Sequence, residues 1–140
     1  MKQFVFLPHT SEAGFEAFGK DLNEVFVNSG IAMINLMTDS KKIKSKSSKR
    51  VAKRAKDVKG LLYDFLDELL FLLETKGFLV GKIENMVVDG DKEGLQLHCI
   101  LFGDNYKNYE VETHIKAPTY YDMVVEKFKG GYKSRVFVDI

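Results

Sequence analysis

The feature that most constrains the fold of this sequence is the apolar stretch between Asp57 and Gly77. Asp57 is suited to cap the first turn of a helix, and Gly77 is suited to end one. Between them, apolar residues recur at helical spacing and cover a wide face: Leu61, Leu62, Phe65, Leu66, Leu69, Leu72 and Leu73. We therefore expect a helix from Asp57 as N-cap to about Thr75, packed against the broad face of a sheet.

A second helix is predicted nearer the start of the chain. Asp21 followed by Glu24 has the spacing of a capping box, in which the Asp side chain accepts hydrogen bonds from first-turn amides. One face of the following segment is mostly apolar at helical spacing: Leu22, Val25, Phe26, Ser29, Ala32, Met33, Leu36 and Met37. This helix should end near Thr38.

The remaining apolar segments read as strands. One surrounds Phe15 and Ala17, and others are expected at 47–55, 78–88, 95–102, 111–117, 124–128 and 132–138. Asp89-Gly90 and Gly130-Gly131 are turn signals between paired strands, which favours antiparallel pairing. The order of elements predicts an α+β fold: a single domain, residues 1–140, with a mostly antiparallel sheet packed against two helices.

Charge is distributed unevenly along the chain. Residues 41–56 contain nine Lys and Arg and no acidic residue, although the whole chain has a net charge of only +1. The rest of the chain therefore carries 12 basic and 20 acidic residues, a net charge of −8. The basic segment 41–56 has two interpretations: a solvated edge strand that its lysines protect from aggregation, or a contact surface for RNA or an acidic protein patch.

Few residues suggest chemistry by themselves. His98 and Cys99 are adjacent on one expected strand, so one should be buried and the other exposed. With a single cysteine, no intrachain disulfide can form. Neither a nucleophile–base pair nor a nucleotide-binding motif is apparent. The apolar stretches are too short, or too interrupted by acids, for a membrane span or a signal peptide, and we expect a cytoplasmic protein.

Three polar sites have ordinary readings. The elbow at residues 8–12 reads as a turn, and Asp39 as a loop residue after the first helix. Asp139 precedes the chain-terminal Ile140, so two carboxylates stand close together unless a cation neutralises them. A solvent-exposed terminal aspartate is the plain alternative.

Taken together, five segments resemble the archease family over essentially the whole chain. Pro8-His-Thr-Ser-Glu12 stands where the family has an Asp-His-Thr-Ala-Asp elbow, and Leu36-Met-Thr-Asp39 matches the end of its first helix. The Leu-rich second helix with its acidic pair is matched by residues 65–70. Residues 115–120, Ile-Lys-Ala-Pro-Thr-Tyr, resemble the family's Val-Lys-Ala-Val-Thr-Tyr, and 137–140 resemble its Phe-Asp-Val or Ile-Asp-Ile ending.

The resemblance implies a function. Archeases assist the tRNA-splicing RNA ligase, which uses GTP and divalent metal and guanylylates its own histidine. The accessory protein promotes guanylylation and multiple turnover and is not itself an enzyme. Two alternatives remain open: an RNA-binding module that uses the basic segment 41–56, and a chaperone-like protein without ligase activation.

The resemblance also implies a site, here called the acidic tip. It consists of Glu12, Asp139 and the main-chain or terminal oxygens of Ile140, with Asp39 as an additional acidic candidate. Ligands that are all oxygen suit calcium, magnesium or manganese. The family's functional lysine matches Lys116, which would act on the partner. The elbow differs from the family pattern, because Glu12 replaces an aspartate and Pro8 replaces the leading one.

Overall fold

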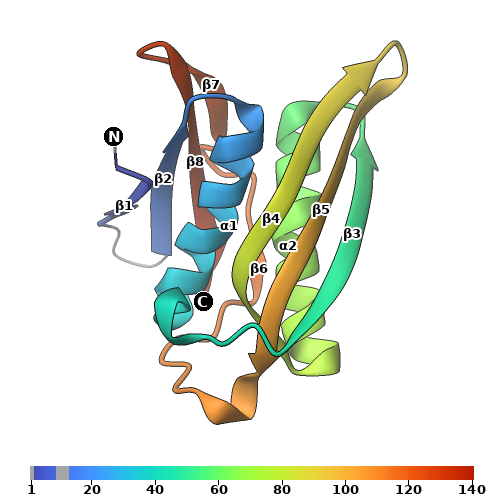
Figure 1. Ribbon diagram of the computed structural model, residues 1–140. Coiled ribbons are helices and arrows are strands. Elements are labelled where there is room, and N and C mark those ends of the chain that lie inside the picture. The colour runs from blue at the N-terminus through green and yellow to red at the C-terminus, as the bar shows by residue number, and fades with distance from the viewer. Residues whose placement is uncertain (1, 9–12) are drawn as a thin grey trace.

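The computed structural model describes residues 2–8 and 13–140. Its elements in chain order are β1 (Phe4–Leu7), β2 (Ala13–Gly19), α1 (Leu22–Met37), the short 3-10 helix η1 (Ser40–Lys42), β3 (Ser47–Ala55), α2 (Val58–Lys76), β4 (Phe78–Asp91), β5 (Gly94–Asn105), the 3-10 helix η2 (Tyr106–Asn108), β6 (Ala117–Pro118), β7 (Val124–Phe128) and β8 (Gly131–Asp139) (Figure 1). The α+β class and the antiparallel pairing of the strands are confirmed.

Both helix predictions are confirmed, and their caps explain why. The Asp21 carboxylate accepts a 2.9 Å hydrogen bond from the Glu24 amide, and Asp57 accepts one of 2.8 Å from the amide of Gly60. Gly77 ends α2 in the left-handed region, with φ of 64°. A residue with a Cβ is strained in that conformation, so a glycine there stops the helix at little cost.

The strands form two sheets rather than the one expected. The first has the order β1-β2-β8-β6, with β7 also paired to β8, and the second has the order β3-β5-β4. Helix α1 lies between them (Figure 1), which explains why its buried residues extend beyond the single face read from the sequence. Gly30 permits this close packing, because a Cβ there would stand 2.7 Å from Ile83 Cδ1.

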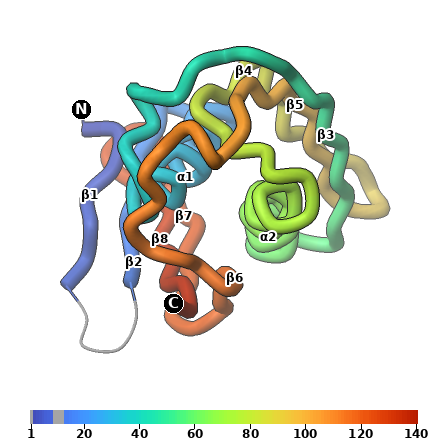
Figure 2. Tube along the Cα trace, turned by 90° about the horizontal axis from the view of Figure 1, so that it is seen from below, coloured from blue at the N-terminus to red at the C-terminus, as the bar shows by residue number. Residues whose placement is uncertain are grey.

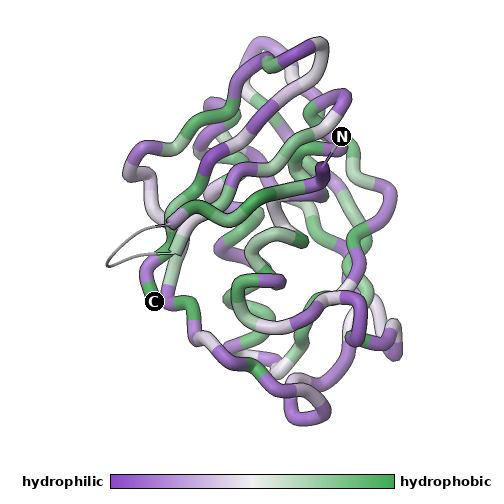
Figure 3. Tube along the Cα trace, turned by 90° about the vertical axis from the view of Figure 1, so that its left-hand side faces the viewer, coloured by the Kyte–Doolittle hydropathy of each residue, from purple (hydrophilic) through white to green (hydrophobic). Residues whose placement is uncertain are grey.

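Helix α2 fills the concave side of the second sheet. Figure 2 shows β4, β5 and β3 arranged around α2, with α1 beside it. Its fully buried residues include Leu61, Leu62, Phe65 and Leu66, so the broad-face prediction is confirmed. In Figure 3 the hydrophobic stretches run through the strands and helices, whereas the turns at the lower end are mainly hydrophilic.

Two turn predictions need correction. The β4–β5 hairpin turns at Lys92-Glu93, and Asp89-Gly90 lies inside the paired strands, where Asp89 is opposite Gln96. The strand pairing therefore extends past a sequence that often forms turns. In the β7–β8 hairpin the turn lies one residue earlier than expected, at Lys129 and Gly130, both of which have positive φ.

The expected strand at 111–117 is the clearest error. The structure forms only the two-residue strand β6 at its end. The segment before it is held at the end of α1 by isolated bonds: the Glu112 amide donates to the Met37 carbonyl, and the Thr38 hydroxyl donates to the Glu110 carbonyl. Pro118 cannot donate a hydrogen bond, so it suits an edge strand of this kind.

Candidate functional site

The candidate site lies where β8 ends. Strand β8 is bounded by β2 on one side and by β7 and then β6 on the other. Its last residue, Asp139, is exposed, and the side chain of the following Ile140 is 50% exposed. Figure 2 shows the C-terminus close to β6 and to the end of β2. The terminal residues are therefore held by strand pairing while their polar groups face solvent.

The segment that carries Lys116 lies directly beside this end. The Lys116 amide donates a 2.8 Å hydrogen bond to the Asp139 carbonyl. Thr119, which directly follows β6, donates two hydrogen bonds to the Phe137 carbonyl, one from its amide at 2.9 Å and one from its hydroxyl at 3.0 Å. The Lys116 side chain is exposed. The lysine and the penultimate aspartate, 23 positions apart in the sequence, are thus neighbours in space.

Glu12 lies outside the described residues. A meeting of Glu12 with Asp139 requires the strand after Glu12 and the last strand to be antiparallel neighbours. They are: β2 pairs with β8, and Ala13 pairs with Val138. In the sequence, Ala13 directly follows Glu12, and Val138 directly precedes Asp139. The meeting of the Glu12 and Asp139 carboxylates stays a prediction.

Asp39 directly follows α1 and the residue Thr38 that ends it. Its carboxylate accepts a 3.0 Å hydrogen bond from the Lys41 amide and caps the short helix η1. It lines a groove of about 530 Å³ together with Phe4, Phe6 and Lys42, and neither Lys116 nor Asp139 takes part in that groove. Asp39 therefore caps η1, and its membership of the acidic tip stays a prediction.

Helix α2 brings further carboxylates toward the end of β8, and the sequence did not reveal this. Burial is the main cause that raises the pKa of the Tyr63 hydroxyl. The negative charges of Asp67, Asp64 and Asp139 raise this pKa further. Asp139 is therefore close enough to α2 for its charge to act there. From the sequence, Asp64 and Asp67 were read only as acidic residues that interrupt the apolar helix, and the spacing of four residues between Tyr63 and Asp67 was the available signal.

Metal ligation has a limited basis in the part of the chain that the structure describes. No group of three or more His, Cys, Asp and Glu side chains gathers there in a way that could hold an ion. The predicted ligand set depends on Glu12 and on the terminal oxygens, with Asp139 as its one described carboxylate. Oxygen donors of this kind match hard divalent cations.

The histidine and cysteine residues have structural explanations. His98 is exposed and Cys99 is buried, as their adjacent positions on β5 predicted. Burial raises the pKa of the Cys99 thiol to about 12, so the thiol stays protonated near neutral pH. A protonated, buried thiol is a poor nucleophile. His114 is exposed, and His9 lies outside the described residues.

The basic segment 41–56 contains η1 and the edge strand β3, whose bounds match the prediction. Three of its charges have partners within the protein. Lys53 pairs with Glu68 at 2.9 Å, Arg54 pairs with Asp91 at 3.0 Å, and Lys49 lies over the Phe78 ring at 5.2 Å. Most of its other basic residues are exposed at the edge of the second sheet. Both interpretations of the segment remain compatible with this placement.

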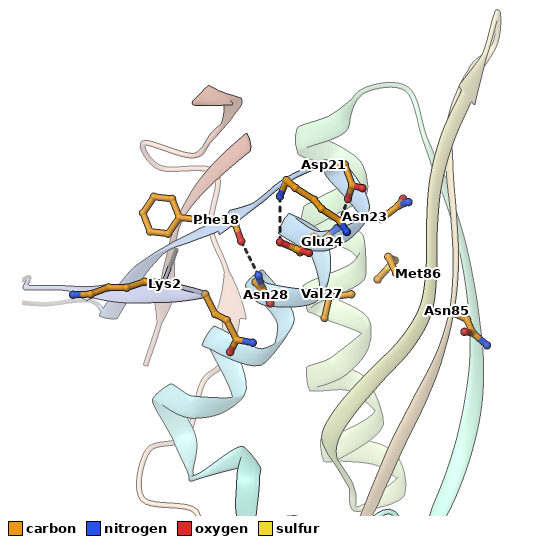
Figure 4. A pocket seen from close by; sticks show the side chains of 11 residues that line it. Lys2, Phe18, Asp21, Asn23, Glu24, Val27, Asn28, Asn85 and Met86 are labelled. Carbon is orange, nitrogen blue, oxygen red and sulfur yellow. Dashed lines mark hydrogen bonds between the residues drawn. The ribbon is translucent and has the colours of Figure 1, made fainter. Parts of the chain in front are cut away.

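A separate groove lies between the start of α1 and β4 (Figure 4). It measures about 660 Å³, and its polar lining is largely used in holding the fold. Asn28 donates to the Phe18 carbonyl at 2.6 Å, and Asn23 accepts from the Val88 amide at 2.7 Å. Glu24 accepts from the Lys20 amide at 3.2 Å. Side chains with these structural duties explain why the groove is polar.

Within residues 2–8 and 13–140, no helix is long and apolar enough to cross a membrane. The longest, α2, is interrupted by acidic residues along its exposed face.

Comparison with known proteins gives a consistent result. The family model of the Archease protein family matches residues 4–140. The chain is 38% identical to the protein archease of Methanothermobacter thermautotrophicus, with all of both chains covered, and 33% identical to that of Methanosarcina mazei, with 99% of this chain and 97% of the relative covered.

Solved structures agree with the sequence matches. The solution structure of protein 1598 of Methanobacterium thermoautotrophicum superposes with a TM-score of 0.85 at 35% identity over both full chains. The crystal structure of an archease, possible chaperone, from Thermotoga maritima has the same fold, with a TM-score of 0.65 at 16% identity over 96% of this chain and 94% of that one. Matched along nearly its whole length in sequence and in structure, the chain belongs to the archease family.

Proposed function

We propose that this protein is a non-catalytic accessory factor that activates a tRNA-splicing RNA ligase. It would promote guanylylation of the ligase and repeated turnover. Family membership is the first support for this proposal. The observation that carries it is the backbone hydrogen bond between Lys116 and Asp139, because it brings two residues implied by the family resemblance to one exposed corner.

The chemistry of this corner suits an accessory role. Asp139 and the terminal oxygens of Ile140, with Glu12, would hold a calcium, magnesium or manganese ion as the acidic tip. Lys116 would supply a positive charge beside it. The described side chains at this corner comprise carboxylates, tyrosines and a lysine, which favour binding and electrostatic positioning over nucleophilic catalysis.

The proposal is tested by adding the purified protein to the ligase of its own organism, with GTP and a divalent metal. Guanylylated ligase and ligated RNA are measured over time. The ligase concentration is kept at a small fraction of the RNA concentration, so that repeated turnover can be seen. We expect faster guanylylation and several turnovers per ligase molecule. Equal rates with and without the protein would refute ligase activation.

An RNA-binding function through the basic segment is the second candidate. Its exposed basic residues, including Lys44, Lys46 and Arg50, favour contact with phosphates. A filter-binding titration without ligase distinguishes the two functions, because phosphate contacts make affinity fall steeply with salt. Tight, salt-dependent RNA binding without the ligase would favour this candidate. A chaperone-like role, suggested by the description of the Thermotoga maritima protein, predicts instead the capture of many unfolded clients.

A further inference from the structure

The outer face of the second sheet, on the side away from α2, is open to solvent. Helix α2 lies on the concave side of β3, β5 and β4 (Figure 2), and the side chains that alternate onto the opposite face are exposed or half-buried. The strand register aligns two neighbouring rows across this face: Ser48, Phe102 and Lys82, and then Arg50, Ile100 and Glu84.

Phe102 supplies a flat ring beside the basic segment. Residues 41–56 contain no aromatic side chain, but the pairing of β3 with β5 places Phe102 directly opposite Ser48. His98 presents a second ring on the same face, four positions earlier on β5, and is exposed. Aromatic rings on an open sheet face are the groups on which RNA-binding domains stack unpaired bases.

Three cations beside the ring, here called the basic row, are exposed: Lys44, Lys46 and Arg50. None of them has an ion-pair partner among the described residues. The Lys46 amide donates a 2.9 Å hydrogen bond to the Gly103 carbonyl, so the contact with β5 extends one residue before β3. Lys46 and Arg50 therefore stand two positions on either side of Ser48, the residue opposite Phe102.

The carboxylates at this end of the face are already engaged. Glu84 pairs with Lys82 at 3.3 Å. Asp104 accepts hydrogen bonds from the Tyr109 hydroxyl at 2.8 Å and from the Asn105 amide at 2.7 Å. The basic row and Lys82 carry four positive charges against these two negative ones, which leaves a net charge of +2 around the ring.

The other end of the face has a different charge. Arg54 pairs there with Asp91 at 3.0 Å, and Asp89, opposite Gln96, is exposed. The positive charge is thus confined to the end that holds Phe102. A surface of this extent suits a few nucleotides rather than a long duplex.

We propose that this end of the sheet binds single-stranded RNA, with an unpaired base stacked on Phe102 and phosphates held by the basic row. The ammonium of Lys82 lies 5.9 Å from the centroid of the Phe102 ring. Its ion pair with Glu84 is exposed and therefore weak, so Lys82 can turn to a phosphate and leave the ring to a base.

RNA fits this face better than an acidic protein does. Protein interfaces depend on an apolar core, and Val87, at 46%, is the one strongly exposed large apolar side chain of the face. The choice of RNA rests on the proposed function, in which the ligase joins RNA ends. The binding itself requires no ligase, so the two can be tested apart.

The test is a fluorescence anisotropy titration of the full chain, without ligase, against an unstructured RNA of about 12 nucleotides. Three phosphate contacts predict that affinity falls about 20-fold between about 50 and 200 mM salt. Near physiological salt the dissociation constant should be about 1–100 μM. That range suits an auxiliary contact made by an accessory factor rather than a tight RNA-binding protein.

Two substitutions separate stacking from charge. Phe102→Leu keeps an apolar side chain but removes the ring, so the dissociation constant should rise about fivefold or more at every salt concentration, with the salt dependence unchanged. Phe102→Tyr, which keeps the ring, should bind as the parent does. Arg50→Ala should instead reduce the slope of log affinity against log salt by about 0.7.

Lys127→Ala is the matched control, because Lys127 is exposed on β7 of the first sheet. It should bind RNA as the parent does, and melting temperatures identify any variant whose loss of affinity comes from unfolding. Absence of RNA binding by the parent, or equal binding by Phe102→Leu and the parent, would overturn the inference. An equal loss in Lys127→Ala and Arg50→Ala would also overturn it, since attraction would then come from overall charge.

The ligation assay distinguishes this inference from the proposed function. If the parent activates the ligase but binds no RNA by itself, the inference is wrong and the function stands. If RNA binding follows the expected pattern among the variants but the ligase is not activated, the RNA site is supported and ligase activation is refuted.

Discussion

A buried pair of hydroxyls joins α1 to β8 and gives a quantitative test of how the terminal strand is held. Ser29 and Ser134 are both fully buried, with their Oγ atoms 2.8 Å apart. Ser29 also donates a 2.6 Å hydrogen bond to the Val25 carbonyl one turn earlier. The Ser29 hydroxyl has one proton and donates it to the Val25 carbonyl. In the Ser29–Ser134 pair, Ser134 must therefore be the donor and Ser29 the acceptor, so the two serines are not equivalent.

This asymmetry predicts different costs for two similar substitutions. Ser134→Ala leaves Ser29 bonded to Val25 and should lower the free energy of unfolding by about 0.5–1.5 kcal/mol, the contribution of one hydrogen bond. Ser29→Ala leaves the Ser134 hydroxyl buried without its partner and should cost about 1–3 kcal/mol. In the double variant no unsatisfied hydroxyl remains, so its cost should be smaller than the sum by about 1 kcal/mol.

Urea unfolding of the parent, the two single variants and the double variant measures this cycle, with the slope of each transition checked for two-state behaviour. For a chain of this length, each 1 kcal/mol corresponds to a shift of about 3 °C in melting temperature. Additive costs, or a larger loss in Ser134→Ala than in Ser29→Ala, would refute the assigned direction of the hydrogen bond.

Three further predictions concern the acidic tip, its lysine and the single thiol. Calcium or manganese should raise the melting temperature through binding to the folded state, an effect that Asp139→Ala should abolish and Glu12→Asp should preserve; an unchanged rise in Asp139→Ala would exclude this ligand. Lys116→Ala should fold normally but lower ligase activation, whereas Lys92→Ala, in the β4–β5 turn, should match the parent; equal activation by both variants at limiting concentrations would remove Lys116 from the site. Because burial raises the pKa of Cys99 to about 12, above that of an unfolded thiol, the stability that Cys99 contributes should be complete at neutral pH and fall as the pH rises above about 8.5. The decrease in urea midpoint between about pH 8 and pH 10 should therefore be smaller in Cys99→Ala, and an equal decrease in both proteins would contradict the burial of this thiol.

Local interactions explain what could be predicted from the sequence. The bounds of α1 and α2 follow from Asp21, Asp57 and Gly77, whose hydrogen bonds and backbone angle involve residues only a few positions away. Apolar segments on either side of the Gly130-Gly131 turn signal likewise identified β7 and β8. Such features depend on neighbours in the chain, so periodicity and capping chemistry are sufficient to find them.

The candidate site depended partly on resemblance and partly on tertiary structure. Lys116 and Asp139 were named from motifs of the family, but their adjacency arises from the pairing of β6 with the end of β8. The stacking of Tyr120 on Tyr63 joins residues 57 positions apart, and no local pattern announces it. Contacts between distant segments are selected by the packing of whole elements.

The sequence by itself determined the helices, because their caps and hydrogen bonds are local, and it determined most of the strands and the α+β class, because apolar segments and turn signals mark them along the chain. Only the tertiary structure decided the division into two sheets, with α1 buried between them, since strand order is a choice among distant partners. It also decided that the β4–β5 pairing continues through Asp89-Gly90, and that 111–117 is held by single bonds rather than by a ladder. There, non-local hydrogen bonds and packing outweigh weak local preferences for turn or strand.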